Sequence, residues 1–205
     1  MWVCCIIMSP FIITLGGNVG CGKSTVIESL KNEFEGDQCV VSSEPIGEWG
    51  SWLDLFYTDP VKYAFGFQMK ILHSFMKLYS SHKTMITERS PLDSLEVFAK
   101  TLYNDKLLNH LEYNLYKSYI ADIAWTPSIY IYIRTEPDTC IKRINKRARG
   151  CETGLDEKYI HRLHSAYEDI QTTISDESFF VVDGNQTKDI IYQSISDIIK
   201  KYVVC

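Results

Sequence analysis

The residues that most clearly could do chemistry form a glycine-rich stretch near the start of the chain. Gly17 and Gly22 enclose four residues and are followed by Lys23 and Ser24, the spacing of a phosphate-binding P-loop. Glycine lets the backbone curl until its N–H groups point at phosphate oxygens. We expect Lys23 to reach the β and γ phosphates of a nucleoside triphosphate and Ser24 to hold Mg²⁺. The predicted nucleotide-binding residues are Gly17, Asn18, Val19, Gly20, Cys21, Gly22, Lys23, Ser24 and Thr25.

The loop has the sequence context that a phosphate site requires. An apolar run at residues 11–15 precedes it, and apolar residues at helical spacing follow over residues 26–34. A strand, a loop and a helix in succession distinguish a P-loop from a glycine-rich turn with a chance Lys-Ser pair, which is the other interpretation.

Beyond the P-loop and the strand before it, four more short apolar runs predict the rest of a sheet. None alternates polar and apolar residues, so the pattern predicts an α/β fold with a five-stranded parallel sheet covered by helices on both faces. The length of 205 residues fits a single domain, residues 1–205. The further strands are expected at residues 39–43, 84–87, 128–133 and 179–182, and helices at 48–57, 60–81, 93–103, 105–125, 137–149, from 156, and at 187–203.

Unusual charges follow directly after the predicted strands. Glu44 follows the second strand, Glu88 and Arg89 follow the third, and Asp183 follows the last. In parallel sheets ligands bind beyond the carboxyl ends of the strands. We therefore expect these side chains to gather with the P-loop at one edge of the sheet.

Composition limits the partners. A net charge of −5 argues against a nucleic-acid binder that works through positive charge. The seven cysteines form no C-x-x-C pair, which favours a reducing, cytoplasmic compartment over a disulfide framework or a zinc site. Residues 1–8 are apolar but too short to span a bilayer, so no membrane partner is expected. Acylation of Cys4 and Cys5 would be the alternative.

Several motifs, the P-loop among them, resemble those of the deoxynucleoside kinase family. They follow one another in the family's order over nearly the whole chain. The resemblance implies a P-loop kinase fold with an arginine-rich lid at about 143–155, a homodimer, and the use of ATP and Mg²⁺. The motifs are Gly17 to Thr25, Glu44-Pro45 with Trp49, Tyr57 to Pro60, Phe67-Gln68, Glu88-Arg89-Ser90, Arg143, Arg147, Arg149, Glu152, and Leu163-His164.

The resemblance assigns roles around the transferred phosphoryl group. Glu44 matches the general base, and a carboxylate is suited to take the proton of an attacking 5′-hydroxyl. Spacing alone leaves an exposed turn glutamate equally open. Glu88 matches a residue near Mg²⁺, and Arg89 one near the 5′-oxygen. Together with Lys23, the predicted catalytic group thus occupies the strand ends.

The arginine-dense end of the helix at 137–149 resembles the family's lid. Arg143, Arg147 and Arg149 would spread positive charge over the migrating phosphoryl group. A solvated helix face is the usual meaning of such a run. Glu152 matches a lid carboxylate that binds the sugar 3′-hydroxyl, and Tyr57 matches its partner.

The expected substrate is a pyrimidine deoxynucleoside. By resemblance, the Gln68 amide reads the base edge, Phe98 stacks on the base, and Trp49 walls the pocket, although an aromatic such as Phe98 is more often plain core. Where relatives carry an Arg and Asp pair, this chain has Phe75 and Ser94. That difference leaves an apolar wall for a 5-methyl group and favours thymidine, with deoxycytidine accepted.

Two further interpretations stay open at this stage. Asp183 and Asn185 resemble the loop that contacts the donor adenine, but they equally suit a plain turn. A thymidylate kinase shares the P-loop and the strand-end Glu-Pro, yet its monophosphate acceptor would need a cation where the chain has Ser43. A non-catalytic nucleotide switch is the alternative from another class.

Overall fold

The chain forms a parallel sheet with helices on both faces, as the sequence predicts. The computed structural model describes residues 10–79, 83–122, 125–147 and 156–203. Its five-stranded sheet has the order β2-β3-β1-β4-β5, and every neighbouring pair is parallel. The strands are β1 (Ile12–Gly16), β2 (Cys39–Ser42), β3 (Thr84–Glu88), β4 (Ile129–Arg134) and β5 (Phe179–Asp183).

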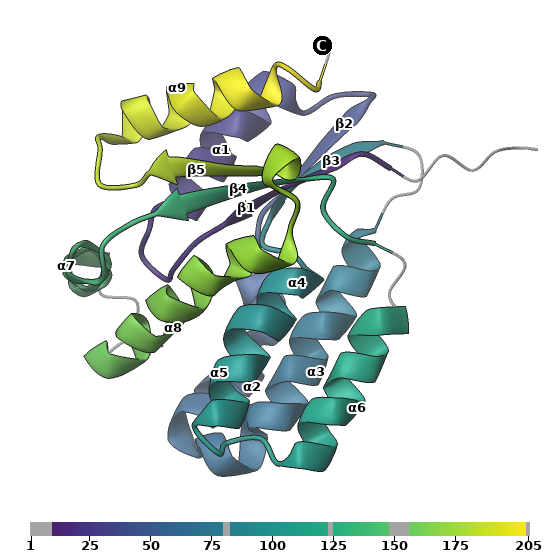
Figure 1. Ribbon diagram of the computed structural model, residues 1–205, viewed down its shortest axis with the longest axis vertical. Helices are drawn as coiled ribbons and strands as arrows, with labels where there is room; N and C mark the ends of the chain where they lie inside the picture. The colour runs from purple at the N-terminus through teal and green to yellow at the C-terminus, as the bar shows by residue number, and fades with distance from the viewer. Residues whose placement is uncertain (1–9, 80–82, 123–124, 148–155, 204–205) are drawn as a thin grey trace, which may run out of the picture.

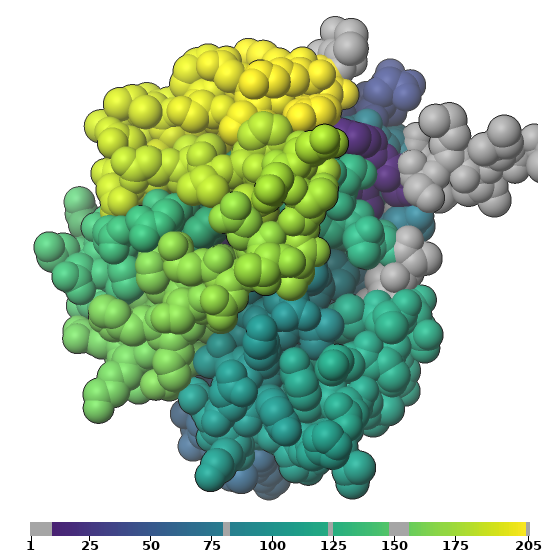
Figure 2. Space-filling view, in the orientation of Figure 1, coloured from purple at the N-terminus to yellow at the C-terminus, as the bar shows by residue number. Residues whose placement is uncertain are grey.

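Helices cover the sheet in two layers (Figure 1). Helices α1 and α9 pack on one face, and most of the others form the opposite layer. In the space-filling view, the surface of α8 lies between that of α9 and those of α5 and α6 (Figure 2). The helices are α1 (Lys23–Phe34), α2 (Ile46–Thr58), α3 (Pro60–Leu78), α4 (Pro91–Asp93), α5 (Lys100–Asn104), α6 (His110–Asp122), α7 (Pro137–Arg147), α8 (Glu157–Asp169) and α9 (Lys188–Ile199).

Local capping explains where two of these helices begin. Asp59 accepts a hydrogen bond from the backbone N–H of Lys62 at 3.2 Å, and Pro60 occupies the first turn of α3. Asp156 accepts one from Lys158 at 3.0 Å and starts α8. A short polar side chain before a helix satisfies an N–H that has no partner inside the helix. Both predicted starts are confirmed.

The predicted helix at 105–125 begins later than expected, at His110. Lys106 has a positive φ of 61°, a conformation that cannot continue a right-handed helix. Asn109 and Glu112 then cap α6 reciprocally, each side chain accepting from the other's backbone N–H at 3.0 and 2.8 Å. This capping box at Asn109 and Glu112, and not the residues from 105 onward, sets the start of the helix.

The predicted helix at 93–103 contains a change of helical type. Residues Ser94–Ala99 form a π-helical segment (η1) between α4 and α5. Such bulges re-aim side chains and are frequent at functional sites. Short 3-10 turns at Ile170–Thr173 and Asp176–Ser178 lead from α8 into β5. Among the helices that the structure describes, no segment is both long and apolar enough to cross a bilayer.

Candidate active site

A cavity of about 460 Å³ lies at the carboxyl ends of the strands. The P-loop lines one end, and side chains from α2, α3 and η1 line the other. A cavity of this volume is within the range typical of small-molecule binding sites. The residues predicted from the sequence that line it are Val19, Gly20, Cys21, Gly22, Lys23, Ser24, Thr25, Glu44, Trp49, Tyr57, Gln68, Phe75, Glu88, Arg89, Ser94, Phe98, Arg143 and Arg147.

The P-loop follows β1 directly and turns into α1. Gly22, at the start of α1, has a φ of 108°, which side chains with a Cβ rarely adopt. A Cβ at Gly20 would lie 2.7 Å from the carbonyl oxygen of Cys140, so close packing against α7 also requires glycine. The Lys23 ammonium donates to the carbonyl oxygens of Gly17 and Asn18 at 2.8 and 2.9 Å, which holds it across the loop.

Two residues of the loop, Asn18 and Cys21, have side chains that pack inside the protein. Asn18 is buried and donates from Nδ2 to the carbonyl of Ile160 at 2.9 Å, which ties the loop to α8. The Cys21 side chain belongs to the core between the sheet and α1. These two side chains are therefore engaged inside the protein, which the spacing of the motif does not reveal.

The Ser24 hydroxyl and the Glu88 carboxylate bring oxygens together at the strand ends, next to the backbone of Glu44. The Ser24 hydroxyl donates to Glu88 Oε1 at 2.9 Å, and Glu88 Oε2 accepts from the backbone N–H of Glu44 at 3.4 Å. Hard cations prefer oxygen ligands, and Mg²⁺ commonly takes one or two from the protein and the rest from phosphates and water. This donor set therefore fits Mg²⁺.

Glu44 and Arg89 form a buried ion pair beside this set. Burial raises the pKa of Glu44 above its usual range, and the Arg89 guanidinium opposes that rise. A carboxyl group in such surroundings keeps its proton to a higher pH than an exposed one and is a stronger base when ionised. The predicted base is thus placed next to a permanent cation.

Two contacts besides the ion pair with Glu44 hold Arg89 in place. Its Nε donates to the Tyr167 hydroxyl at 3.3 Å, and its guanidinium carbon lies 4.8 Å from the centre of the Phe98 ring. The residue also has a φ of 62°, which costs a non-glycine residue energy and is typical of functional sites. Phe98, predicted to stack on a base, therefore lines the cavity while also packing on the arginine.

A buried carboxylate that sequence reasoning missed supports the turn after β3. Asp93 accepts hydrogen bonds from the backbone and hydroxyl of Ser90 at 2.9 and 2.7 Å and from the Tyr130 hydroxyl at 2.6 Å. A Cβ at Gly16 would lie 1.8 Å from that hydroxyl, so the glycine before the P-loop makes room for Tyr130. The Ser-x-x-Asp capping-box spacing was the signal that could have identified Asp93.

The far end of the cavity is mostly apolar with one amide. Gln68 is 2% exposed. Trp49 is fixed by a hydrogen bond from its indole N–H to Ser74 at 3.2 Å and packs edge-on against Phe67. Pockets for small molecules commonly combine apolar walls with a few placed polar groups. Apolar lining residues that sequence reasoning missed, because they look like ordinary core, are Ile46, Leu53, Phe56 and Ile71. Phe67, from the Phe67-Gln68 motif, also lines the cavity.

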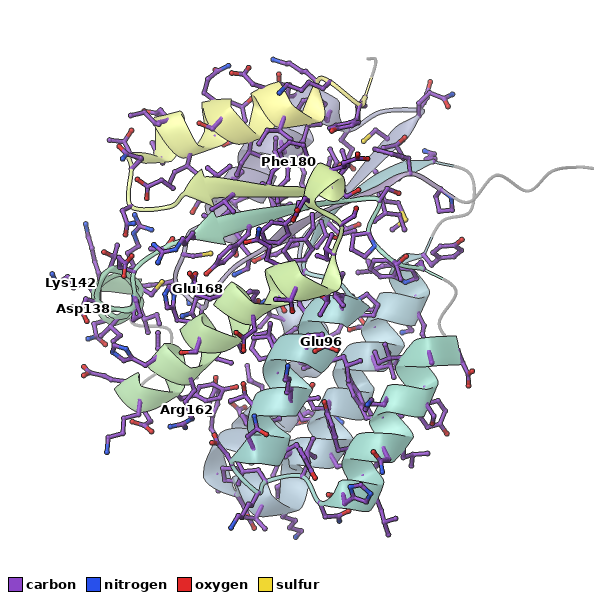
Figure 3. All side chains as sticks on the ribbon, viewed as in Figure 1. Glu96, Asp138, Lys142, Arg162, Glu168 and Phe180 are labelled. Carbon is purple, nitrogen blue, oxygen red and sulfur yellow. The ribbon has the colours of Figure 1, made fainter. Side chains whose placement is uncertain are left out.

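The cationic side of the cavity comes from α7. Arg143 donates to the carbonyl oxygens of Cys21 and Gly184 at 3.1 and 2.9 Å, and so links the P-loop to the turn after β5. Asp138 and Lys142 point away from the sheet on the outer side of α7 (Figure 3). The basic run is therefore divided: Arg143 and Arg147 line the cavity, whereas Lys142 does not.

The remaining predicted residues fall outside this arrangement or beside it. Arg149 and Glu152 lie outside the described residues. Asp183 accepts from the backbone of Asn185 at 2.9 Å, and Asn185 in turn accepts from the backbone of Glu136 at 3.2 Å. These two side chains hold the turn after β5 and do not line the cavity. Tyr57 does line it, together with Tyr159, a residue of α8 that sequence reasoning missed.

Helix α8 contributes Tyr159 to the cavity and Tyr167 to the binding of Arg89, and it is itself anchored to the sheet. Glu168, labelled in Figure 3 with Arg162, accepts from the Tyr132 hydroxyl at 2.7 Å and pairs with Arg134 at 3.1 Å. Tyr132 also stacks on Tyr167 with ring centres 5.7 Å apart. The helix that follows the basic segment thereby fixes the hydroxyl that binds Arg89.

Comparisons with known proteins agree with this geometry. The sequence model of the deoxynucleoside kinase family matches residues 13–204. Protein 029R of Invertebrate iridescent virus 3 is 35% identical over 190 residues, covering 90% of this chain and 94% of that protein. The thymidine kinase of Ictalurid herpesvirus 1 is 27% identical over 197 residues, covering 92% and 85%.

A solved structure has the same fold. The deoxyadenosine kinase from M. mycoides, determined with the products dCMP and a flexible dCDP, superposes with a TM-score of 0.82 at 27% identity and covers 94% of this chain and 100% of its own. The match therefore extends over the P-loop, the strand-end charges and α7 together. The chain belongs to the deoxynucleoside kinase family, and it is an enzyme that phosphorylates deoxynucleosides.

Proposed function

We propose that the enzyme transfers the γ-phosphoryl group of ATP to the 5′-hydroxyl of a pyrimidine deoxynucleoside, with thymidine favoured and deoxycytidine accepted. The observation that carries this proposal is the order of groups along one cavity. Lys23 and Ser24 lie at one end, the Glu44–Arg89 pair lies in between, and the Gln68 amide lies among apolar side chains at the other end. Donor, reacting groups and acceptor would follow in that sequence.

At the donor end, the triphosphate would be held by backbone N–H groups of the P-loop and by Lys23. The Lys23 ammonium would exchange its two carbonyl partners for phosphate oxygens. Arg143 and Arg147, joined by Arg149, would stabilise the charge that spreads over the phosphoryl group during transfer. Ser24 and Glu88 would hold Mg²⁺, which neutralises phosphate charge when bound.

Between the two ends, Glu44 would accept the proton of the attacking 5′-hydroxyl. Arg89 would orient that carboxylate and lie close to the entering phosphoryl group. A carboxyl group whose pKa is raised by burial is better matched to this proton transfer near neutral pH than an ordinary one. The protein would then position the two substrates, accept the proton of the 5′-hydroxyl and stabilise the charge on the transferred phosphoryl group.

At the acceptor end, Gln68 would bind the base edge, and Trp49 and Phe75 would wall the pocket. Phe75 offers an apolar contact for a 5-methyl group. The viral relative named a thymidine kinase supports thymidine, and the dCMP product in the mycoplasma enzyme supports acceptance of deoxycytidine. Tyr57, with Glu152, would bind the sugar 3′-hydroxyl, so 3′-deoxy analogues should be poor substrates.

The decisive experiment is a rate panel with ATP over the four deoxynucleosides and thymidine monophosphate. We expect the highest kcat/KM with thymidine, a lower value with deoxycytidine and little turnover of the monophosphate. Faster turnover of a purine deoxynucleoside would contradict the proposed base preference. Preferred turnover of the monophosphate would make the enzyme a thymidylate kinase, and nucleotide hydrolysis independent of any nucleoside would favour a switch.

We also propose that the enzyme is a homodimer. Helices α3 and α6 lie side by side and carry large apolar side chains that solvent reaches, among them Met76, Leu111, Leu115 and Tyr119. Large apolar side chains exposed together on neighbouring helices are typical of protein–protein interfaces. An isologous contact through these helices would bury these side chains.

A further inference from the structure

Three buried polar side chains connect α6 to the acceptor end of the cavity. The Tyr116 hydroxyl lies 2.6 Å from Ser94 Oγ, and Ser94 Oγ lies 3.3 Å from Gln68 Oε1. Gln68 and Ser94 line the cavity, whereas Tyr116 is 0% exposed. The amide proposed to bind the base is thus linked to a hydroxyl group that a nucleoside would not touch.

The two hydrogen bonds that link Tyr116, Ser94 and Gln68 have one consistent donor-to-acceptor direction. Among the residues that the structure describes, Ser94 is the hydrogen-bonding partner of the Tyr116 hydroxyl, so Tyr116 must donate its single hydrogen to Ser94. Ser94 then donates its own hydrogen to Gln68 Oε1, and the amide NH₂ group is turned away from Ser94. A flipped amide would leave one buried hydroxyl hydrogen without an acceptor, which is energetically costly.

We propose that Tyr116 is a positioning residue that fixes the orientation of the Gln68 amide through Ser94 and thereby sets which pyrimidine the enzyme prefers. This inference rests on the proposed function. Thymine carries a hydrogen on N3 and an oxygen at C4, whereas cytosine has an acceptor at N3 and an amino group at C4. An amide held in one orientation matches only one of these patterns fully, while an amide free to flip adapts to both.

The test is the effect of Tyr116→Phe on the ratio of kcat/KM for thymidine to that for deoxycytidine. This change removes the hydroxyl and keeps the ring in its buried position. We expect the ratio to move toward one by about threefold to tenfold. The net free energy of a neutral hydrogen bond corresponds to a change in kcat/KM of about that size. The change should fall mainly on KM, because Tyr116 lies behind the cavity and apart from the reacting groups.

Tyr113→Phe is the matched control. Tyr113 lies on the same helix and stacks on Tyr103 with ring centres 4.5 Å apart, outside the chain of hydrogen bonds. This variant should keep the wild-type ratio. A shift of the ratio in Tyr113→Phe as large as in Tyr116→Phe would contradict a specific role for the Tyr116 hydroxyl.

Ser94→Ala removes the middle hydroxyl of the same hydrogen-bonded series. If Tyr116→Phe does not fold, the kcat/KM ratio of Ser94→Ala tests the proposal instead. The double variant should shift the ratio no further than Ser94→Ala alone, because both changes break one path. Additive shifts, or an unchanged ratio in both folded variants, would overturn the positioning role and leave the proposed function intact. A wild-type enzyme that phosphorylates neither nucleoside would overturn both proposals together.

Discussion

At the scale of single residues, the role proposed for Glu44 has the sharpest consequences. Glu44→Gln should lower kcat by about 10²-fold or more, the contribution typical of a positioned base, with little change in KM for the nucleoside. A base acts only when ionised, and burial raises the pKa of Glu44. The wild-type kcat/KM should therefore hold above that pKa and fall as the pH drops through it, at a higher pH than an exposed glutamate would give.

Steady-state kinetics from acid to neutral pH measures both effects. Glu48→Gln is the control, since Glu48 lies on α2 four residues away with a side chain that is 52% exposed. It should behave like the wild type. Full activity of Glu44→Gln would remove Glu44 from the mechanism, and an acid limb at the position of an ordinary carboxylate would contradict the effect of burial.

At the scale of elements, α7 lines the cavity with Arg143 and Arg147 and turns Lys142 outward. Arg143 donates to carbonyl groups of the P-loop and of the turn after β5, so Arg143→Ala should remove a cation from the proposed donor site and also loosen both segments. We expect kcat/KM for ATP to fall by about 10²-fold, the scale of losing one group that stabilises the transition state. Lys142→Ala, the neighbouring change on the outer side of the helix, should alter it less than about twofold. Equal effects in the two variants would show that α7 acts only through its general positive charge.

At the scale of the whole molecule, the apolar surface on α3 and α6 predicts the oligomeric state. Leu115→Lys places a charge on that surface and should shift the protein from dimer to monomer in sedimentation velocity experiments, since a desolvated unpaired charge disfavours an interface. Ile190→Lys, at an exposed position of α9 on the opposite face of the sheet, should remain dimeric. A wild-type protein that sediments as a monomer, or a Leu115→Lys variant that stays dimeric, would contradict the proposed interface.

The sequence alone determined the features that depend on short, local patterns of residues. The spacing of glycines, Lys23 and Ser24 specifies a P-loop because the curl of a few residues creates the phosphate site. Apolar runs specified the parallel strands because a strand covered on both faces must be apolar throughout. Charges placed just after those runs, such as Glu44 and Arg89, were predictable because parallel strands end at one edge of a sheet.

The tertiary structure decided what depends on partners far apart in the chain. Tyr130 binds Asp93, Tyr167 binds Arg89, and Tyr116 reaches Gln68 through Ser94. Each buried tyrosine resembles ordinary core in the sequence, because an aromatic residue at helical or strand spacing has the same pattern whether or not its hydroxyl is used. The geometry of a hydrogen bond is set only when two elements pack, so the orientation of the site's polar groups is a property of the folded molecule.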